Sequence, residues 1–274
     1  MSPGPVADRL ADPARLSIAE LRRRIEAVDD EATIEAYCAR LAADPRSGAR
    51  LLGERMARRL AARRHECARL AALFERRAAL FASGAHHVAG IDEVGVGPLA
   101  GPVVAAAVVL PERVDLPGLD DSKKLSRPAR ERLCTAIREQ ALAIGIGEVP
   151  AAEIDRLNIL RASLEAMRRA VTQVSRCLSL DHLLVDARTV PGVSVPQTAL
   201  IHGDAIDGSI AAASIVAKEH RDALMRSLDA LHPGYGFARH VGYGTAEHMD
   251  ALRRLGATPV HRRSFAPVAA VARG

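Results

Sequence analysis

Acidic residues interrupt or end three apolar, strand-like runs of this 274-residue chain. The first run contains Asp92 and Glu93, the second ends at Asp186, and the third ends at Asp204. A carboxylate at the buried end of a strand is costly to desolvate, and a divalent cation is the strongest partner available to it. Oxygen ligands suit Mg²⁺ or Mn²⁺, and two such ions can activate water for phosphodiester hydrolysis. Each acid alone is equally well explained as a surface group beyond a strand, but the three together favour metal binding.

A sheet is needed to bring these acids to one edge, and the sequence from His86 onward has the pattern of one. Short runs rich in Val and Ile alternate there with helical patterns. We expect strands at residues 88–94, 102–110, 142–149, 182–187 and 198–203. We expect helices at residues 127–141, 151–175, 209–230 and 245–255. The sequence therefore predicts an α/β domain whose strand ends present the carboxylates.

The composition changes near Ser83-Gly84, and we expect residues 1–84 to form a separate all-α extension, with residues 85–274 as the second domain. The extension is rich in Ala, Leu, Arg and Glu, which favour helices. We expect its helices at residues 17–28, 31–43 and 49–82. We interpret the arginines of the third helix as a solvated face, and a nucleic-acid-binding stripe is the alternative.

Charge and cysteine content narrow the class of protein. A formal net charge of +5 fits an anionic partner but does not require one. The four cysteines have neither zinc-site spacing nor the density of a disulfide scaffold, so we expect reduced, mostly buried thiols. No run approaches the roughly 20 apolar residues of a membrane span, and residues 1–20 lack the pattern of a signal peptide. We therefore expect a cytoplasmic protein, not bound to membranes, and a monomer because nothing in the sequence demands more.

Residues 90–102, GIDEVGVGPLAGP, resemble the opening motif of bacterial ribonuclease HII. Further similar motifs follow in the same order: Asp121–Ser126, Leu157–Leu160, Val185–Ala187, Gly203-Asp204, Ala212–Lys218, Arg221-Asp222, Tyr235–Phe237, His240–Thr245 and His261–Phe265. Together they cover residues 86–268, to within a few residues. The helical extension, with its Asp44-Pro45-Arg46 break, is similar to one carried by a subset of this family. Two roles for this extension stay open: it is a tether, or it binds the nucleic-acid duplex.

The resemblance implies an α/β, RNase H-like fold: a mixed five-stranded sheet flanked by helices, followed by a C-terminal helical part. It also implies a four-acid site for Mg²⁺ or Mn²⁺, made of Asp92, Glu93, Asp186 and Asp204. The implied reaction cuts on the 5′ side of a ribonucleotide, in an RNA–DNA hybrid or in duplex DNA with embedded ribonucleotides, and leaves 3′-hydroxyl and 5′-phosphate ends. The sister family ribonuclease HIII has Glu as its fourth acid, so Asp204 favours ribonuclease HII.

Ribose recognition is expected at the loop Gly95-Val96-Gly97, since the 2′-hydroxyl is the group that distinguishes RNA from DNA at a given site. Glycines leave the backbone N–H and C=O groups accessible. In the family this loop reads the 2′-hydroxyl, and the tyrosine that matches Tyr243 packs on the neighbouring deoxyribose; a core aromatic is the alternative for Tyr243. Lys218 either faces the site or pairs with an acid there. Asp222, four residues later on the same helical face, is expected to orient Lys218 or a metal-bound water. We expect substrate contacts from Lys123, Lys124, Ser214 and Lys218.

Three positions depart from the family pattern. Val96 stands where Arg is usual, and His202 and Val241 stand where Lys is usual. Each loss removes a possible phosphate contact, so we expect weaker substrate binding at this face. Two other functions stay open: a nuclease of the same fold acting on other DNA structures such as junctions, and a hybrid-binding protein with weakened or lost turnover. The first of these leaves the Gly-x-Gly loop and the tyrosine unexplained.

Overall fold

The computed structural model describes residues 16–271 and divides into two compact units, one ending at Arg69 and the other beginning at Leu70. The composition of the sequence changes later, near residue 84. The helix α4 (Glu75–Ala82) therefore packs with the second unit although its composition is like that of the first. A division into functional domains at residues 84 and 85 stays a proposal.

Helices make up the described part of the first unit. These are α1 (Ile18–Glu26), α2 (Glu31–Ala42) and most of α3 (Ser47–Leu73). Ser17 and Asp30 begin the first two helices, and their side chains accept hydrogen bonds from backbone N–H groups in the first turn, as capping residues do. The core of this unit consists of Leu21, Ile25, Tyr37, Leu41, Ala49 and Met56.

An ion pair shapes the corner between α2 and α3. Nη2 of Arg46 lies 2.7 Å from Oδ2 of Asp44, and Nη1 of Arg46 donates to the carbonyl oxygen of Leu16 at 2.6 Å. The hydrogen bonds from Arg46 lower the pKa of Asp44 to about 2. The Asp44-Pro45-Arg46 motif is thus a structural corner of the first unit.

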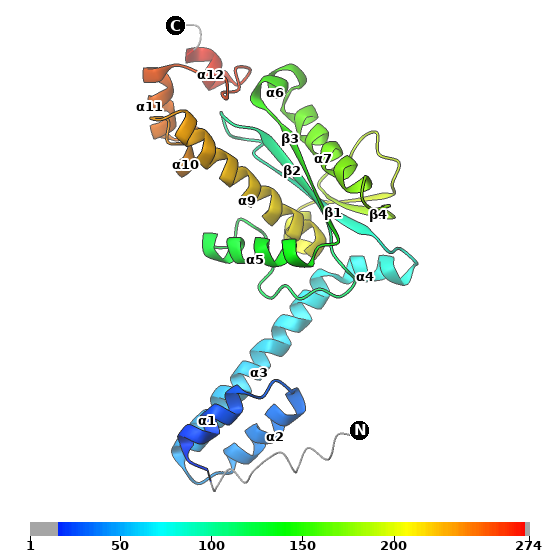
Figure 1. Ribbon diagram of the computed structural model, residues 1–274, viewed down its shortest axis with the longest axis vertical. Helices are drawn as coiled ribbons and strands as arrows, with labels where there is room; N and C mark the ends of the chain where they lie inside the picture. Colours follow the sequence, from blue (N-terminus) through cyan, green and yellow to red (C-terminus); the bar gives the residue numbers. More distant parts are fainter. Residues whose placement is uncertain (1–15, 272–274) are drawn as a thin grey trace. The chain divides into compact units, whose positions relative to one another are not determined.

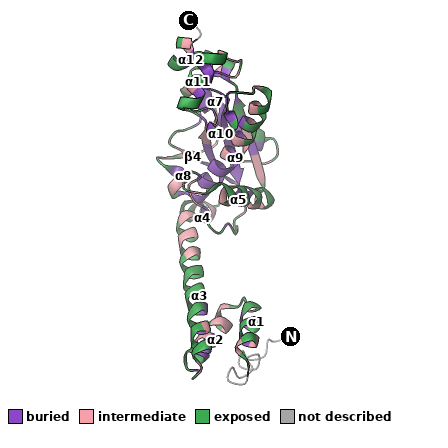
Figure 2. Ribbon diagram, turned by 90° about the vertical axis from the view of Figure 1, so that its left-hand side faces the viewer, coloured by how far each residue is buried: buried purple, intermediate pink, exposed green. Residues whose placement is uncertain are grey.

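Much of α3 is exposed (Figure 2), and most of its arginines are exposed residues. The exposed ones are Arg50, Arg55, Arg58, Arg59, Arg63 and Arg64. Arg64 forms ion pairs with Glu31 and Glu35 at 3.2 and 2.7 Å. This exposure is what a solvated face of arginines requires. The alternative, that these arginines bind nucleic acid, stays a prediction.

The second unit contains the expected mixed five-stranded sheet, in the order β3-β2-β1-β4-β5 (Figure 1). The strands are β1 (Val88–Val94), β2 (Val103–Val109), β3 (Ala143–Val149), β4 (His182–Asp186) and β5 (Gln197–Leu200). β2 is antiparallel to both β1 and β3, while β4 is parallel to both β1 and β5. Because β1 and β4 run in the same direction, with Ile91 opposite Val185, their carboxyl ends meet at one edge of the sheet.

Helices cover both faces of this sheet, with α7 on one face and α9 on the other (Figure 1). The remaining helices are α5 (Arg127–Gln140), α6 (Ala151–Leu157), α7 (Ile159–Ser175), α8 (Gly203–Ile206), α9 (Gly208–Leu231), α10 (Phe237–His240), α11 (Ala246–Leu255) and α12 (Ala266–Val271). Alternate residues of β2 serve the two cores: Ala105 and Ala107 face the core of α7, and Ala106 and Val108 face the core of α9. No helix in residues 16–271 is long and apolar enough to cross a membrane.

Two strand glycines let the helices approach the sheet closely. A Cβ at Gly90 of β1 would lie 2.0 Å from the carbonyl oxygen of Ser209 in α9, and a Cβ at Gly147 of β3 would lie 1.9 Å from that of Ala166 in α7. Any larger residue would push these helices away. The contact at Gly90 brings the start of α9, just after Asp204, against the strand that carries Asp92.

Three expectations about the elements are wrong in detail. The helix expected at 49–82 is broken at Phe74, and the helix expected at 151–175 is broken at Asn158, which has a φ of 72° and caps α7 by accepting from the N–H of Arg161. Asp204 does not end a buried strand, because β5 ends at Leu200 and Asp204 lies in α8. The chain reaches α8 through His202, whose backbone is left-handed with a φ of 57°.

The cysteines are only partly as expected. All four are free thiols, but Cys67 and Cys177 are exposed and Cys134 is the buried one. The expectation of mostly buried thiols is therefore wrong. Cys67 lies on the exposed side of α3.

Candidate active site

Three of the predicted acids lie together at the carboxyl ends of β1 and β4. Asp92, Glu93 and Asp186 each offer an oxygen atom, and these atoms lie within 4.8 Å of one another. Oε2 of Glu93 is buried and has no hydrogen-bond partner among the described residues. A buried, unpartnered carboxylate oxygen within a group of oxygen donors is what a divalent cation would satisfy. The donor set therefore fits Mg²⁺ or Mn²⁺.

The electrostatics of the three acids lead to the same conclusion. Burial, and then repulsion from Glu93, raises the pKa of Asp92 well above its usual value. Burial also raises the pKa of Glu93, against a hydrogen bond from Ser163, and that of Asp186, against a hydrogen bond of 2.7 Å from the N–H of Gly203. Without a cation these carboxylates repel one another, and a bound cation would reverse that balance.

Asp204 lies beside this group and is bound by Lys123. Nζ of Lys123 is 2.7 Å from Oδ2 of Asp204, which is only 5% exposed. The charge of Asp204 contributes to the raised pKa of both Asp92 and Asp186, as expected for a fourth neighbouring acid. Burial alone would lower the pKa of Lys123, but its hydrogen bond with Asp204 raises that pKa overall. The ammonium group thus neutralises the fourth acid in this structure.

We expect Lys123→Ala to increase the affinity of the free protein for Mn²⁺ by about two- to fivefold. Lys123 competes with a cation for Asp204, and an ion pair whose ammonium group is exposed contributes about 0.2–1 kcal/mol. The measurement is a Mn²⁺ titration in the absence of nucleic acid, in which calorimetry or electron paramagnetic resonance detects the bound Mn²⁺. Lys124→Ala is the matched control, because Lys124 pairs with Asp120 at 3.1 Å instead. Equal affinity in wild type and Lys123→Ala would show that Lys123 does not compete.

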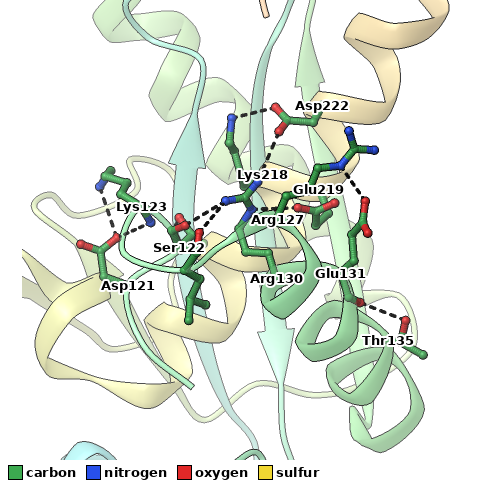
Figure 3. A network of polar contacts seen from close by, with 12 residues as sticks. Asp121, Ser122, Lys123, Arg127, Arg130, Glu131, Thr135, Lys218, Glu219 and Asp222 are labelled. Atoms are coloured by element: carbon green, nitrogen blue, oxygen red, sulfur yellow. Dashed lines mark hydrogen bonds and ion pairs between the residues drawn. The ribbon is translucent and has the colours of Figure 1, made fainter. Parts of the chain in front are cut away.

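A polar network holds the loop with Lys123 against α9 (Figure 3). Nη1 of Arg130 donates to the carbonyl oxygen of Ser122 at 3.3 Å, and Nε of Arg130 pairs with Glu219 of α9 at 2.8 Å. The hydroxyl groups of Ser122 and Ser214 are 2.9 Å apart, and Ser214 also hydrogen-bonds to Asp92. Ser214 is buried, so the structure places it beneath the acids, where it orients Asp92.

The two remaining basic residues of the predicted site are engaged within the protein. Nζ of Lys218 pairs with Oδ1 of Asp222 at 2.8 Å (Figure 3), which is one of the two arrangements expected for Lys218. Lys124 pairs with Asp120. Substrate contacts by Lys123, Lys124, Ser214 and Lys218 stay predictions.

The predicted ribose-reading loop and Tyr243 lie next to each other. A Cβ at Gly97 would meet Cε1 of Tyr243 at 3.5 Å, which is ordinary contact. Tyr243 is 48% exposed and Val96 is 40% exposed. Tyr243 is therefore a surface aromatic and not part of the core, and its ring lies beside the Gly-x-Gly loop.

Two buried histidines support the backbone of Tyr243. The N–H of Thr258 donates to Nδ1 of His261 at 3.0 Å, so this nitrogen carries no proton. Nε2 of His261 lies 3.1 Å from Nε2 of His248, whose Nδ1 lies 2.9 Å from the carbonyl oxygen of Tyr243. All these contacts are satisfied only by neutral rings, with His261 protonated at Nε2 and His248 at Nδ1. Burial accordingly lowers the pKa of His248, and that of His261 to about 4.

Sequence reasoning missed several residues that build the site. Ser163 of α7 hydrogen-bonds to Glu93, and Arg221 and Arg262 are the largest fully buried side chains of residues 16–271. Both arginines lie in motifs noted above, Arg221-Asp222 and His261–Phe265, but their positions in the sequence gave no sign of burial.

The chain is similar to known proteins over most of its length. The ribonuclease HII family model matches residues 89–268. The ribonuclease HII of Anaeromyxobacter sp. (strain Fw109-5) is 50% identical over 261 residues, which cover 95% of this chain and 82% of that protein. The ribonuclease HII of Desulfitobacterium hafniense (strain Y51) is 48% identical over 255 residues, covering 93% and 96%. These alignments are longer than the second unit, so they include part of the helical extension.

Solved structures show the same fold. The ribonuclease H2 from Pyrococcus horikoshii OT3 superposes with a TM-score of 0.58 at 25% identity, covering 68% of this chain and 97% of that one. Bst-RNase HIII in complex with Mn²⁺ superposes with a TM-score of 0.54 at 21% identity, covering 69% and 70%. The expected RNase H-like fold is confirmed.

Proposed function

The chain belongs to the ribonuclease HII family, and from this premise we propose how it selects and cuts its substrate. As a member of this family it is a metal-dependent endoribonuclease of the ribonuclease H type 2 class, acting on RNA–DNA hybrids. We propose that it hydrolyses the phosphodiester bond on the 5′ side of a ribonucleotide, in hybrids or in duplex DNA with embedded ribonucleotides, leaving 3′-hydroxyl and 5′-phosphate ends. In this proposal a monomer is sufficient for cleavage, because the four acids, the loop at residues 95–97 and Tyr243 all belong to one polypeptide.

The observation that carries the proposal is the acid cluster with its unpartnered Glu93 oxygen. Asp92, Glu93, Asp186 and Asp204 would hold Mg²⁺ or Mn²⁺. Such ions polarise a phosphoryl oxygen and lower the pKa of water when they are bound. The protein contributes the rigid placement of the acids, with Ser214 orienting Asp92.

Selection of the ribonucleotide falls to the loop at residues 95–97 and to Tyr243. The exposed backbone of the loop offers hydrogen-bonding groups to a 2′-hydroxyl, which DNA lacks. The half-exposed ring of Tyr243 offers a flat apolar surface to the adjacent sugar. A ribose on this platform would lie near the acids, because the loop follows β1 directly.

A duplex with one embedded ribonucleotide tests the proposal. Incubation of the full-length protein with this duplex and Mg²⁺ or Mn²⁺ should give one cut on the 5′ side of the ribonucleotide. The matched all-DNA duplex should stay intact. Binding without cleavage would instead support a hybrid-binding protein, and cutting of all-DNA junctions would support a nuclease of another specificity.

We expect the double variant Val96→Arg/Val241→Lys to bind the single-ribonucleotide duplex more tightly at low salt. Two added phosphate contacts would steepen the log–log salt slope by about 1.8, so the gain should shrink roughly tenfold between about 50 and 200 mM salt. The change at residue 241 should fold well, because Val241 has a left-handed φ of 45°, which is unfavourable for a β-branched residue. Fluorescence anisotropy at several salt concentrations measures the slope.

The control adds one positive charge at the other end of the sheet. Leu142 is 53% exposed and precedes β3 opposite Val109, far from the loop at 95–97. Leu142→Arg should change neither affinity nor salt slope appreciably. Identical salt slopes for the double variant and wild type would show that residues 96 and 241 do not face phosphates.

A further inference from the structure

The guanidinium group of Arg262 is buried directly beneath the loop at residues 95–97. It donates from Nη2 to the carbonyl oxygen of Gly95 at 2.5 Å, from Nη1 to that of Val96 at 2.9 Å, and from Nε to that of Gly101 at 3.1 Å. The residue has no exposed surface, and its guanidinium carbon lies 5.2 Å from the centre of the Phe265 ring. One side chain thus fixes two successive peptide groups of the loop.

A second buried guanidinium joins this loop to the segment before Tyr243. Arg221 donates to the carbonyl oxygens of Pro102 at 3.0 Å, Val241 at 3.0 Å and Ala100 at 3.2 Å. A Cβ at Gly95 would lie 2.2 Å from Nε of Arg221, so this glycine makes room for the guanidinium. Its φ of 87° also requires glycine. Gly95 therefore contacts both arginines.

In residues 16–271, the hydrogen-bond acceptors of these two cations are all main-chain carbonyl oxygens. Neither forms an ion pair with a carboxylate anywhere in residues 16–271, and burial lowers the pKa of Arg221 and, to about 9, that of Arg262. Burying two like charges without an acid is costly. A guanidinium suits the place because its planar fork of five donors can reach three carbonyls, which the compact ammonium of lysine cannot.

The carbonyl contacts determine what the loop presents to solvent. In a trans peptide the C=O of one residue and the N–H of the next point in opposite directions. Because the carbonyls of Gly95 and Val96 point down to Arg262, the N–H groups of Val96 and Gly97 point away from it. Neither N–H has a hydrogen-bond partner in the described part of the chain. The loop thus holds two adjacent donors ready for a ligand.

We infer that Arg262 is the positioning residue for ribose recognition: it fixes these two donors, while Arg221 fixes the Tyr243 segment beside them. The inference rests on the proposed reading of the 2′-hydroxyl by this loop. It assigns a role in specificity to the His261–Phe265 motif, which contains none of the four acids.

The test compares wild type with Arg262→Lys on two matched duplexes, one all-DNA and one with a single ribonucleotide. Affinities are measured without divalent metal, so that neither duplex is cut, and their ratio reports recognition of the 2′-hydroxyl. We expect this ratio to fall towards one in Arg262→Lys, and the single-turnover cleavage rate with Mg²⁺ to fall about 100-fold, as for a misplaced reacting group. Affinity for all-DNA duplex and for Mn²⁺ should stay within about twofold, because the phosphate contacts and the acids are untouched.

Arg263→Lys is the matched control, since Arg263 is the exposed neighbour of Arg262 in the same motif. It should keep the wild-type ratio. A folded Arg262→Lys protein that also keeps this ratio overturns the inference. If Arg262→Lys does not fold, Phe265→Leu removes the ring near the guanidinium, keeps an apolar side chain against the neighbouring core, and should lower the ratio about threefold. An unchanged ratio there is equally decisive against the inference.

Different results would contradict the proposed function and the proposed role of Arg262. A wild-type protein that binds both duplexes equally and cuts neither contradicts the proposed function. A wild-type protein that discriminates and cuts as proposed, with Arg262→Lys doing the same, contradicts only the role of Arg262.

Discussion

Replacing Asp92 by asparagine should lower cleavage of the single-ribonucleotide duplex by roughly a thousandfold or more, because metal ions contribute several kcal/mol to catalysis. Asp92 is the buried member of the acid cluster, and its carboxylate lies among the oxygen atoms that would hold the cation. Asparagine keeps the size and one oxygen but removes the charge. Single-turnover assays with Mg²⁺ and with Mn²⁺ measure the loss.

The same substitution should leave the metal-free protein at least as stable as wild type. Asp92 is buried beside Glu93 and repelled by it, so removing its charge relieves repulsion in the folded state. Thermal unfolding in EDTA should therefore give an equal or higher midpoint, and the stabilisation by Mn²⁺ should disappear. Asp250→Asn, on the exposed side of α11, is the control and should behave as wild type. Cleavage within tenfold of wild type by a folded Asp92→Asn protein would contradict the metal site.

Acidification from pH 6.5 to pH 4 should lower the free energy of unfolding by about 3 kcal/mol through His261 alone. Burial lowers the pKa of this residue from 6.5 to about 4 in the folded protein, and unfolding restores it. Between these values the unfolded chain binds more protons, so this contribution is present above pH 6.5 and is lost as the pH falls towards 4. His248 faces His261 across the 3.1 Å contact and shifts in the same direction, and His232 adds a further like charge.

Urea unfolding at several pH values measures this effect, with His261→Gln to isolate it. Glutamine cannot take up the proton, so the variant should be less stable at pH 7 but should lose about 3 kcal/mol less between pH 6.5 and 4. His220→Gln is the control, because His220 pairs with Glu148 at the surface. Parallel stability curves for wild type and His261→Gln would show that His261 is not kept neutral by the fold.

The sheet and most of its helices could be predicted from local sequence. Runs such as residues 88–94 and 182–187 are short and mostly apolar, and they form β1 and β4 within a residue. Asp92 and Asp186 were predicted to meet at one edge of the sheet. They do so because β1 and β4 are parallel neighbours in the structure. Asp204 was identified by its acidity next to an apolar run, but its true position on α8 depends on the left-handed turn at His202, which carries no local signal.

Individual hydrogen bonds and ion pairs between distant parts of the chain could not be predicted. The ion pair between Lys123 and Asp204 joins residues 81 positions apart, and the hydrogen bond from Arg262 to Gly95 spans 167 positions. In addition, the acceptor for Arg262 is a main-chain carbonyl, which every residue possesses, so no partner residue type marks it in the sequence. The breaks at Phe74 and Asn158 likewise result from packing and capping and not from helix-breaking residues such as Pro or Gly.

The carbonyl contacts of Arg221 and Arg262 also explain how Val can occupy positions 96 and 241. Both arginines bind the backbone oxygens of these residues, so the loops keep their shape whichever side chain is present. Changes of the side chains at 96 and 241 therefore leave the loop backbone in place, whereas a change of either arginine removes hydrogen bonds that hold it. In the proposed mode of binding, the backbone that Arg221 and Arg262 hold would recognise the sugar, and the side chains at 96 and 241 would set the strength of phosphate binding. A mutant library confined to these two positions should therefore change affinity and keep the preference for ribose.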